Sequence, residues 1–229
     1  MNLVLLHGLG ANGRVWDAWP HANFAPDLPG HGSAATLPSY TFAAMAAAIA
    51  AMAAADLPVR RDVVLLGHSL GGVIALELAS GRYDVTLSRV VALGVKVSWS
   101  ADDLGRANAL AQKPVAWFES RDEAAARFLK VSGLQGLADP ADAVVDHGLL
   151  EEDGRWRLAL DPATFGVGAP DMPALIAASQ AEVVLARGER DPMNSDAELH
   201  ALHDQVVTLP GLGHNAHVED PAAVAALLR

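Results

Sequence analysis

Residues 63–78 place a serine between two glycines at the point where two hydrophobic patterns meet. Val63 to Leu66 is an unbroken apolar run that is typical of a buried strand, and apolar residues recur at helical spacing after Ser69. A serine at the tip of so tight a turn adopts strained backbone, so its neighbours Gly67 and Gly71 need to lack side chains. The stretch predicts a strand, a sharp turn that exposes the serine hydroxyl, and a helix.

This arrangement favours a nucleophilic role for Ser69. A helix that begins at Leu70 directs unpaired N–H groups and the positive end of its dipole toward an anion formed beside the serine. The spacing glycine-x-serine-x-glycine also occurs by chance in loops, but the strand before it and the helix after it favour a catalytic turn.

Apolar runs and helix-like segments alternate along much of the chain. Together with residues 63–66, we expect short strands at residues 3–6, 24–25, 89–93, 182–186 and 205–209. Such alternation predicts a parallel sheet of about six strands with helices on both faces. The first strand begins at the second or third residue, so we expect its outer edge to be covered by a loop or by a second copy of the chain in a homodimer.

The alternation lapses between residues 98 and 172, where helix-like segments at 101–112 and 121–131 carry several aromatic residues, including Trp99, Trp117 and Trp156. We interpret residues 98–172 as a helical insertion into a core formed by residues 1–97 and 173–229. The length of 229 residues suits a single α/β domain.

Charge and composition exclude several classes of function. The chain has 16 Lys and Arg against 27 Asp and Glu, a net charge of −11, which disfavours a nucleic-acid partner. It has no cysteine, so disulfides, thiolate metal sites and a cysteine nucleophile are excluded. No apolar run is long enough for a membrane span or a signal segment, and no metal, P-loop or dinucleotide motif occurs. We expect a soluble cytoplasmic protein that needs no cofactor.

Two later residues complement the serine. Asp191 follows the strand expected at 182–186, and His214 follows the strand expected at 205–209. Ligands of open parallel sheets bind beyond the carboxyl ends of the strands, so both residues should lie at the edge that carries Ser69. The order serine, aspartate, histidine also differs from the orders in the chymotrypsin and subtilisin folds.

Five ordered motifs together resemble the α/β-hydrolase fold family. They are His7-Gly8-Leu9-Gly10, residues 27–33 (Asp-Leu-Pro-Gly-His-Gly-Ser), residues 67–72 (Gly-His-Ser-Leu-Gly-Gly), residues 188–191 (Gly-Glu-Arg-Asp) and Gly213-His214. The resemblance implies an α/β-hydrolase fold in which residues 98–172 form the variable cap. It implies a triad of Ser69, Asp191 and His214, with the oxyanion hole formed by the N–H groups of Leu9 and Leu70. Members commonly have an antiparallel hairpin before the first strand, and we expect none before residues 3–6.

Some assignments within this resemblance stay open. Asp102 or Asp103 is a rival acid, because some members of the family carry the acid after the strand expected at 89–93. His217, three residues beyond His214, is a rival base, although the Gly213-His214 match favours His214. We expect His68, beside the nucleophile, to support the catalytic groups rather than to transfer a proton.

The motifs predict a serine hydrolase that cleaves small carboxylic esters or thioesters. The same triad also serves lactone opening, carbon–carbon hydrolysis and elimination, and a ligand-sensing protein on the same scaffold is an alternative of another class. The apolar and aromatic content of residues 98–172 and the negative net charge favour an apolar, uncharged small-molecule substrate.

Overall fold

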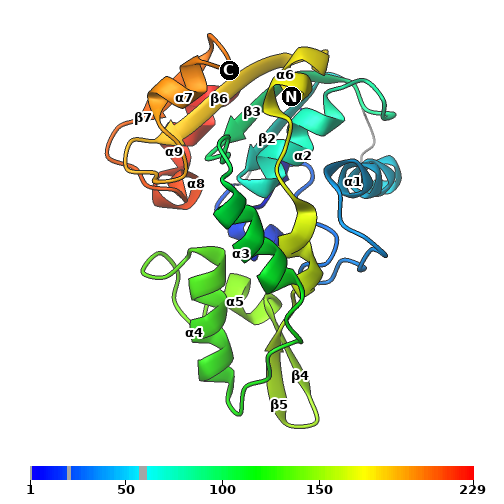
Figure 1. Ribbon diagram of the computed structural model, residues 1–229, viewed down its shortest axis with the longest axis vertical. Coiled ribbons are helices and arrows are strands. Elements are labelled where there is room, and N and C mark those ends of the chain that lie inside the picture. Colours follow the sequence, from blue (N-terminus) through cyan, green and yellow to red (C-terminus); the bar gives the residue numbers. More distant parts are fainter. Residues whose placement is uncertain (1, 20–21, 57–60) are drawn as a thin grey trace.

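Five parallel strands form the centre of the computed structural model, which describes residues 2–19, 22–56 and 61–229 (Figure 1). In sheet order they are β1 (Asn2–Leu6), β2 (Val63–His68), β3 (Leu87–Leu93), β6 (Glu182–Gly188) and β7 (Val206–Leu209). Every neighbouring pair is parallel, so all the strands end at one edge of the sheet. The predicted α/β-hydrolase fold with a parallel sheet is confirmed.

Side chains on the strands alternate between two hydrophobic layers. On β2, Val63 and Leu65 face one layer, whereas Val64 and Leu66 face the other. The first layer is covered by α1 (Phe42–Asp56), α2 (Leu70–Leu78) and α6 (Met172–Ala178), and the second by η1 (Gly13–Trp16), α8 (Ala216–Glu219), α9 (Pro221–Ala225) and η3 (Ala226–Leu228). Burial on both faces explains why these strands are apolar at nearly every position.

The sixth strand expected, at residues 24–25, is reduced to one bridge between Phe24 and Val4. Phe24 also exchanges backbone hydrogen bonds with Leu3 and Leu5 on the outer edge of β1. Pro26 follows at once and has no N–H group with which to continue a ladder, so the pairing stays short. The chain nevertheless covers the edge of β1 with its own loop, which is one of the two covers expected.

The helices of the core begin at local capping signals and differ in length. Thr41 caps α1, since its Oγ1 accepts a hydrogen bond from the Ala44 N–H. The short helix after β1 is the single 3₁₀ turn η1, which is capped by Asn12 through a hydrogen bond from the Arg14 N–H. Helix α7 (Asp196–His200) begins after its cap at Ser195 but stops short of His203, whose ring instead contacts the carbonyl of Val183 in the sheet.

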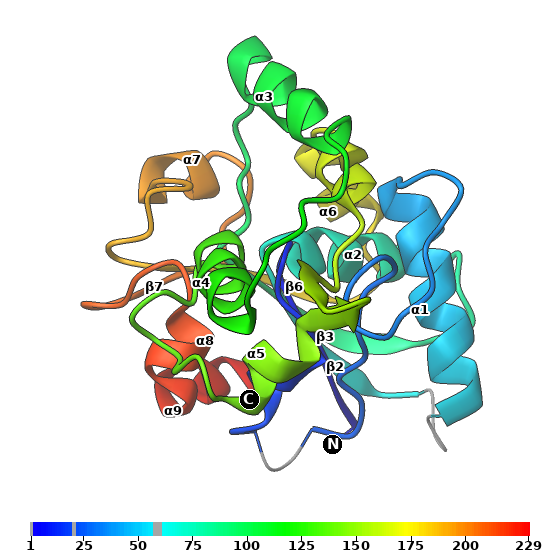
Figure 2. The same ribbon diagram turned by 90° about the horizontal axis from the view of Figure 1, so that it is seen from below.

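The chain between β3 and α6 forms a layer of its own (Figures 1 and 2). It contains α3 (Ala101–Ala111), α4 (Arg121–Ser132), α5 (Ala143–His147), β4 (Leu149–Glu152), β5 (Arg155–Leu158) and η2 (Pro162–Val167). Strands β4 and β5 pair as an antiparallel hairpin, which the expectation of a purely helical insertion missed. Asp153 and Gly154 form its turn, and both have positive φ, as a tight hairpin turn requires.

This layer packs on the loops that follow the strands of the sheet. Its own small hydrophobic core includes Phe128 and Val145. Asn12 of the core donates a side-chain hydrogen bond to the carbonyl of Val144. His147 Nε2 lies 2.7 Å from Asp27 Oδ2. Within the described residues, no helix combines the length and the apolar character needed to cross a membrane.

Candidate active site

Ser69 occupies the turn between β2 and α2 in a strained conformation, with φ of 50° and ψ of −114°. A Cβ atom on Gly67 would lie 2.2 Å from the carbonyl oxygen of Gly71, and one on Gly71 would lie 2.4 Å from that of Leu6. Both glycines are therefore required by close backbone approach. The structure accordingly holds the Ser69 backbone from both sides, since its N–H also donates to the Leu93 carbonyl at 2.8 Å.

Two backbone donors lie beside this serine. A Cβ atom on Gly8 would be 3.3 Å from Ser69 Cβ, which places the loop after β1 directly against the nucleophile turn. Leu9 and Leu70 both line the cavity that contains Ser69. Within the described residues, neither of their N–H groups donates a hydrogen bond to another protein group. They are available to an oxyanion formed at this position.

Asp191 and His214 are brought together at the same edge of the sheet. His214 Nδ1 lies 3.0 and 3.1 Å from the two carboxylate oxygens of Asp191. The side chain of Asp191 is fully buried, whereas that of His214 remains 21% exposed. No hydrogen bond joins His214 to the Ser69 hydroxyl within the described residues, so the third contact of a closed triad is open in this structure.

The rival acids have other partners. Asp103 is the third residue of α3, where it accepts from the Ser100 N–H and contacts Lys96 and Arg106 at 3.2 and 2.6 Å. Hydrogen bonds from Ser100, together with the two cations, hold the pKa of Asp103 well below its usual value. Asp102 lies in the same first turn of α3. Neither carboxylate contacts His214.

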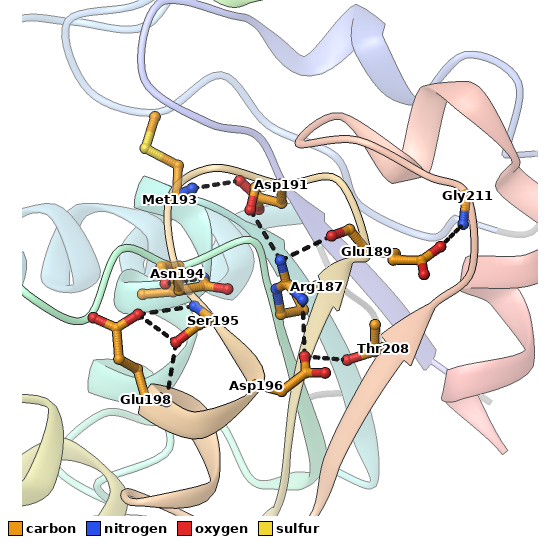
Figure 3. Close-up of polar contacts among 11 residues, drawn as sticks. Arg187, Glu189, Asp191, Met193, Asn194, Ser195, Asp196, Glu198, Thr208 and Gly211 are labelled. Carbon is orange, nitrogen blue, oxygen red and sulfur yellow. Dashed lines mark hydrogen bonds and ion pairs between the residues drawn. The ribbon is translucent and has the colours of Figure 1, made fainter.

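A buried arginine supports the loop that carries Asp191 (Figure 3). Arg187, near the end of β6, donates to the main-chain carbonyls of Glu189 and Asp191 and pairs with Asp196 at 2.8 Å. Asn194 ties the same loop to the chain after β3 through a 2.7 Å bond to the Val95 carbonyl. These bonds fix the backbone of Asp191, so that its carboxylate stays directed at the histidine.

His68 contacts both the ring and the backbone carbonyl of His214. The two rings lie 4.6 Å apart, and His68 Nε2 is 2.9 Å from the carbonyl oxygen of His214. Burial, reinforced by the neighbouring histidines, lowers the pKa of His68 well below its ordinary value, so this ring is neutral and its Nε2–H donates to the carbonyl. The sequence indicated only that His68 would support the site, and its contact with His214 depends on the fold.

His217 packs away from Asp191. Its ring lies between Trp16, at 4.5 Å, and His68, at 4.3 Å. Burial and the adjacent charge of His214 lower its pKa to about 3, so it stays neutral in neutral solution. The structure gives His217 a packing position, and His214 is the histidine beside the buried carboxylate.

The cavity beside Ser69 has a volume of about 80 Å³ and is mostly apolar. It is lined by Leu9, Phe42, Ser69, Leu70, Val73, Lys96, Trp99, Val167, Gly168 and Pro170. Of the tryptophans named above, only Trp99 is among these residues. A second apolar cavity, of about 100 Å³, lies between α3, α4 and η2. No group of three or more metal-ligating side chains occurs in the described parts of the chain.

Comparisons with known proteins show the family of the chain and support its fold. The sequence matches the profile described as the alpha/beta hydrolase family over residues 3–227. Lipase LipV of Mycobacterium tuberculosis is 33% identical over 168 residues, which cover 69% of this chain and 62% of the lipase. The match therefore spans less than two thirds of that relative.

Other similarities extend over nearly the whole chain. The 2-succinyl-6-hydroxy-2,4-cyclohexadiene-1-carboxylate synthase of Yersinia enterocolitica is 29% identical over 244 residues, covering 99% of this chain and 84% of the synthase. The crystal structure of E-2-(acetamidomethylene)succinate hydrolase superposes with a TM-score of 0.80 at 22% identity, covering 99% of this chain and 89% of that one. At this identity the structural match supports the shared fold alone.

Proposed function

The chain belongs to the alpha/beta hydrolase family, and we propose that it is a serine hydrolase of small carboxylic esters or thioesters. The observation that carries the proposal is the pairing of His214 with the buried Asp191 at the edge of the sheet where Ser69 is held in a strained turn. A nucleophile, a base and an orienting acid on adjacent loops are the parts that acyl transfer needs.

The proposed reaction proceeds in two halves. Ser69 Oγ attacks the carbonyl carbon, and its proton moves to Nε2 of His214 while Asp191 holds Nδ1. The N–H groups of Leu9 and Leu70 stabilise the negative charge on the carbonyl oxygen. Collapse of the intermediate expels the alcohol or thiol, which takes the proton from His214 and leaves an ester on Ser69. Water then repeats the sequence and releases the acid.

The insertion contributes to substrate choice in this proposal. We assign residues 98–172 as a cap over the core formed by residues 1–97 and 173–229. Trp99 and Val167 of this segment line the cavity beside Ser69, so the cap and the core share its wall. In this proposal the cavity of about 80 Å³ receives one end of a small-molecule substrate. The cytoplasmic location and the homodimer expected from the sequence remain predictions.

A panel of short esters, thioesters and lactones tests this proposal together with a fluorophosphonate probe. We expect the probe to label Ser69 and at least one ester to be hydrolysed, and Ser69→Ala to abolish labelling and lower kcat by at least ~10³. The matched control is Ser132→Ala, because Ser132 is buried in α4 of the cap and bonds only backbone carbonyls. Labelling of the Ser69→Ala protein at another residue would refute the assignment.

One relative supports a second use of the same triad. The full-length similarity to a synthase is compatible with an elimination in which His214 removes a carbon-bound proton. Turnover of no ester, thioester or lactone in the panel, although Ser69 is labelled by the probe, would favour this second function.

A further inference from the structure

The cavity beside Ser69 contains a charged group that the sequence pattern did not associate with the site. Lys96 is the one charged residue among those that line the cavity in the described part of the chain. It follows β3 by three residues, at the edge of the sheet that also presents Ser69 and His214. The wall of a mostly apolar cavity therefore includes a lysine side chain, in a protein whose net charge is −11.

Neighbouring residues hold the Lys96 side chain in place. Its Nζ lies 3.2 Å from Asp103 Oδ2 and 5.4 Å from the centre of the Trp99 ring. Trp99, in turn, donates its Nε1–H to the carbonyl of Lys96 at 3.1 Å. The lysine side chain is only 28% exposed, so part of its hydration shell has been exchanged for an aromatic face and one carboxylate.

The ammonium group keeps hydrogen-bonding capacity for a ligand. An ammonium group has three donors, and Asp103 is its one salt-bridge partner within the described residues. Asp103 does not depend on Lys96, because Arg106 and the Ser100 N–H also bind its oxygens. Two cations therefore share the carboxylate of Asp103, and the carboxylate of Glu198 also lies within electrostatic range of Lys96.

We propose that Lys96 binds a carboxylate of the substrate, so that the enzyme acts on esters or thioesters that also carry a free acid group. This inference deepens the proposed function and rests on it. A partly desolvated ammonium gains more from a carboxylate than from an alkyl group, because the charge-assisted hydrogen bond compensates for water lost on binding. The inference replaces the uncharged substrate that composition had favoured.

Two pairs of isosteric esters test the inference on either side of the scissile bond. Monomethyl glutarate is compared with methyl 5-methylhexanoate, and 3-acetoxypropanoate with 3-methylbutyl acetate, so that a carboxylate replaces an isopropyl group in each pair. We expect kcat/KM for the charged ester to exceed that for its neutral isostere by about tenfold or more in at least one pair. Addition of salt should reduce this ratio.

Substitution of the lysine separates its charge from its packing. Lys96→Met keeps the stem over Trp99 and should reduce the charged-to-neutral ratio about tenfold, which is the effect of losing one charge-assisted contact. Lys130→Met is the matched control, because Lys130 is an exposed lysine of α4 that is not among the residues lining the cavity. That variant should keep the wild-type ratio within about twofold.

A binding measurement keeps this inference separable from the proposed function. Glutarate should raise the melting temperature of the Ser69→Ala protein, and the double variant with Lys96→Met should lose that shift. Ratios near one in both ester pairs, or a ratio unchanged by Lys96→Met, would overturn the role of Lys96 while leaving ester hydrolysis intact. Absence of all turnover and of Ser69 labelling would refute the proposed function, and the glutarate shift would then decide the lysine site alone.

Discussion

The edge of the sheet and the cap meet at the cavity beside Ser69, but they are held in place by different means. At the edge, backbone atoms approach so closely that a Cβ on Gly188 would lie 2.2 Å from the Gly213 carbonyl oxygen. In the cap, α3 has no buried residue, and the exposed Trp117 is covered only by two arginine side chains. The proposed chemistry lies in the closely packed part, and the proposed selection of substrate lies where side chains can change at little structural cost.

The largest expected difference between the core and the cap is in how their stability responds to low pH, because the core buries histidines and the cap does not. Burial first, reinforced by neighbouring histidines, lowers the pKa of His7 to about 4 and those of His31 and His217 to about 3, although backbone hydrogen bonds and the charge of Asp27 partly oppose the shift at His7 and His31. These rings bind fewer protons in the folded than in the unfolded chain between pH 6.5 and those values. Stability is therefore complete above about pH 7 and falls as the pH drops, by about 2 kcal/mol for each histidine at pH 5.

Denaturant unfolding at pH 8 and pH 5 measures this effect. His217→Phe keeps a ring between Trp16 and His68 and should reduce the pH dependence by about 2 kcal/mol. The exposed His200 provides the control, since His200→Gln should leave the dependence unchanged. A free energy of unfolding that stays constant between pH 8 and pH 5 would show that these core histidines do not remain neutral.

The next largest effect is expected on kcat, from substitution of the two aspartates that could be the acid of the triad. Asp191→Asn should lower kcat by about 10⁴, because an amide no longer stabilises the imidazolium of His214 and favours the wrong tautomer. Asp103→Asn, in α3 of the cap, should change kcat on a neutral ester less than threefold. A reversed pattern would move the acid from the core to the cap and break the contrast between the two regions.

The core and the cap also differ in how much of their structure could be predicted from the sequence. The positions of Ser69, Asp191 and His214 could be predicted because each follows an apolar run, which is buried in β2 and β6 and partly buried in the edge strand β7. The sixth strand could not, because two apolar residues before Pro26 carry too little pattern to separate a strand from a single bridge. The hydrogen bond from His68 to the His214 carbonyl depends on how two distant loops meet.

In the cap, the sequence contains a turn signal for the β4–β5 hairpin, but the surrounding helix-like pattern is stronger. Asp153-Gly154 between alternating residues is a strong hairpin signal, yet the helix-like segments around it led to the expectation of a purely helical insertion. The position of Lys96 in the Ser69 cavity had no local signal, because a lone lysine after a strand reads as solvated surface. Its proximity to Trp99 and Asp103 arises only when the chain turns into α3.

Effects of intermediate size are expected from two glycine substitutions, one at the edge of the sheet and one in the cap. A Cβ on Gly8 would lie 2.7 Å from His68 Nδ1, so Gly8→Ala should displace the ring that supports His214 and lower kcat by about 10². Gly105, in α3, has nothing within 4 Å of its Cβ position. Gly105→Ala should therefore stabilise the protein by about 0.5 to 1 kcal/mol through helix propensity, with kcat unchanged. A Gly8→Ala enzyme with wild-type kcat would show that the edge tolerates more movement than its contacts indicate.

The smallest effects are expected within the cap, where two tryptophans occupy different environments. Trp99 lines the cavity beside Ser69, whereas Trp117 lies at the surface with Arg155 4.9 Å from its ring. Trp99→Ala enlarges the cavity, so the acyl length that gives the highest kcat/KM in a series of neutral esters should increase by one or two carbons, each worth about 0.8 kcal/mol when buried. Trp117→Ala should leave that optimum in place, because Trp117 is not among the residues that line the cavity. An equal shift in both variants would mean that the cap acts on the cavity through its overall packing rather than through the side chains that line it.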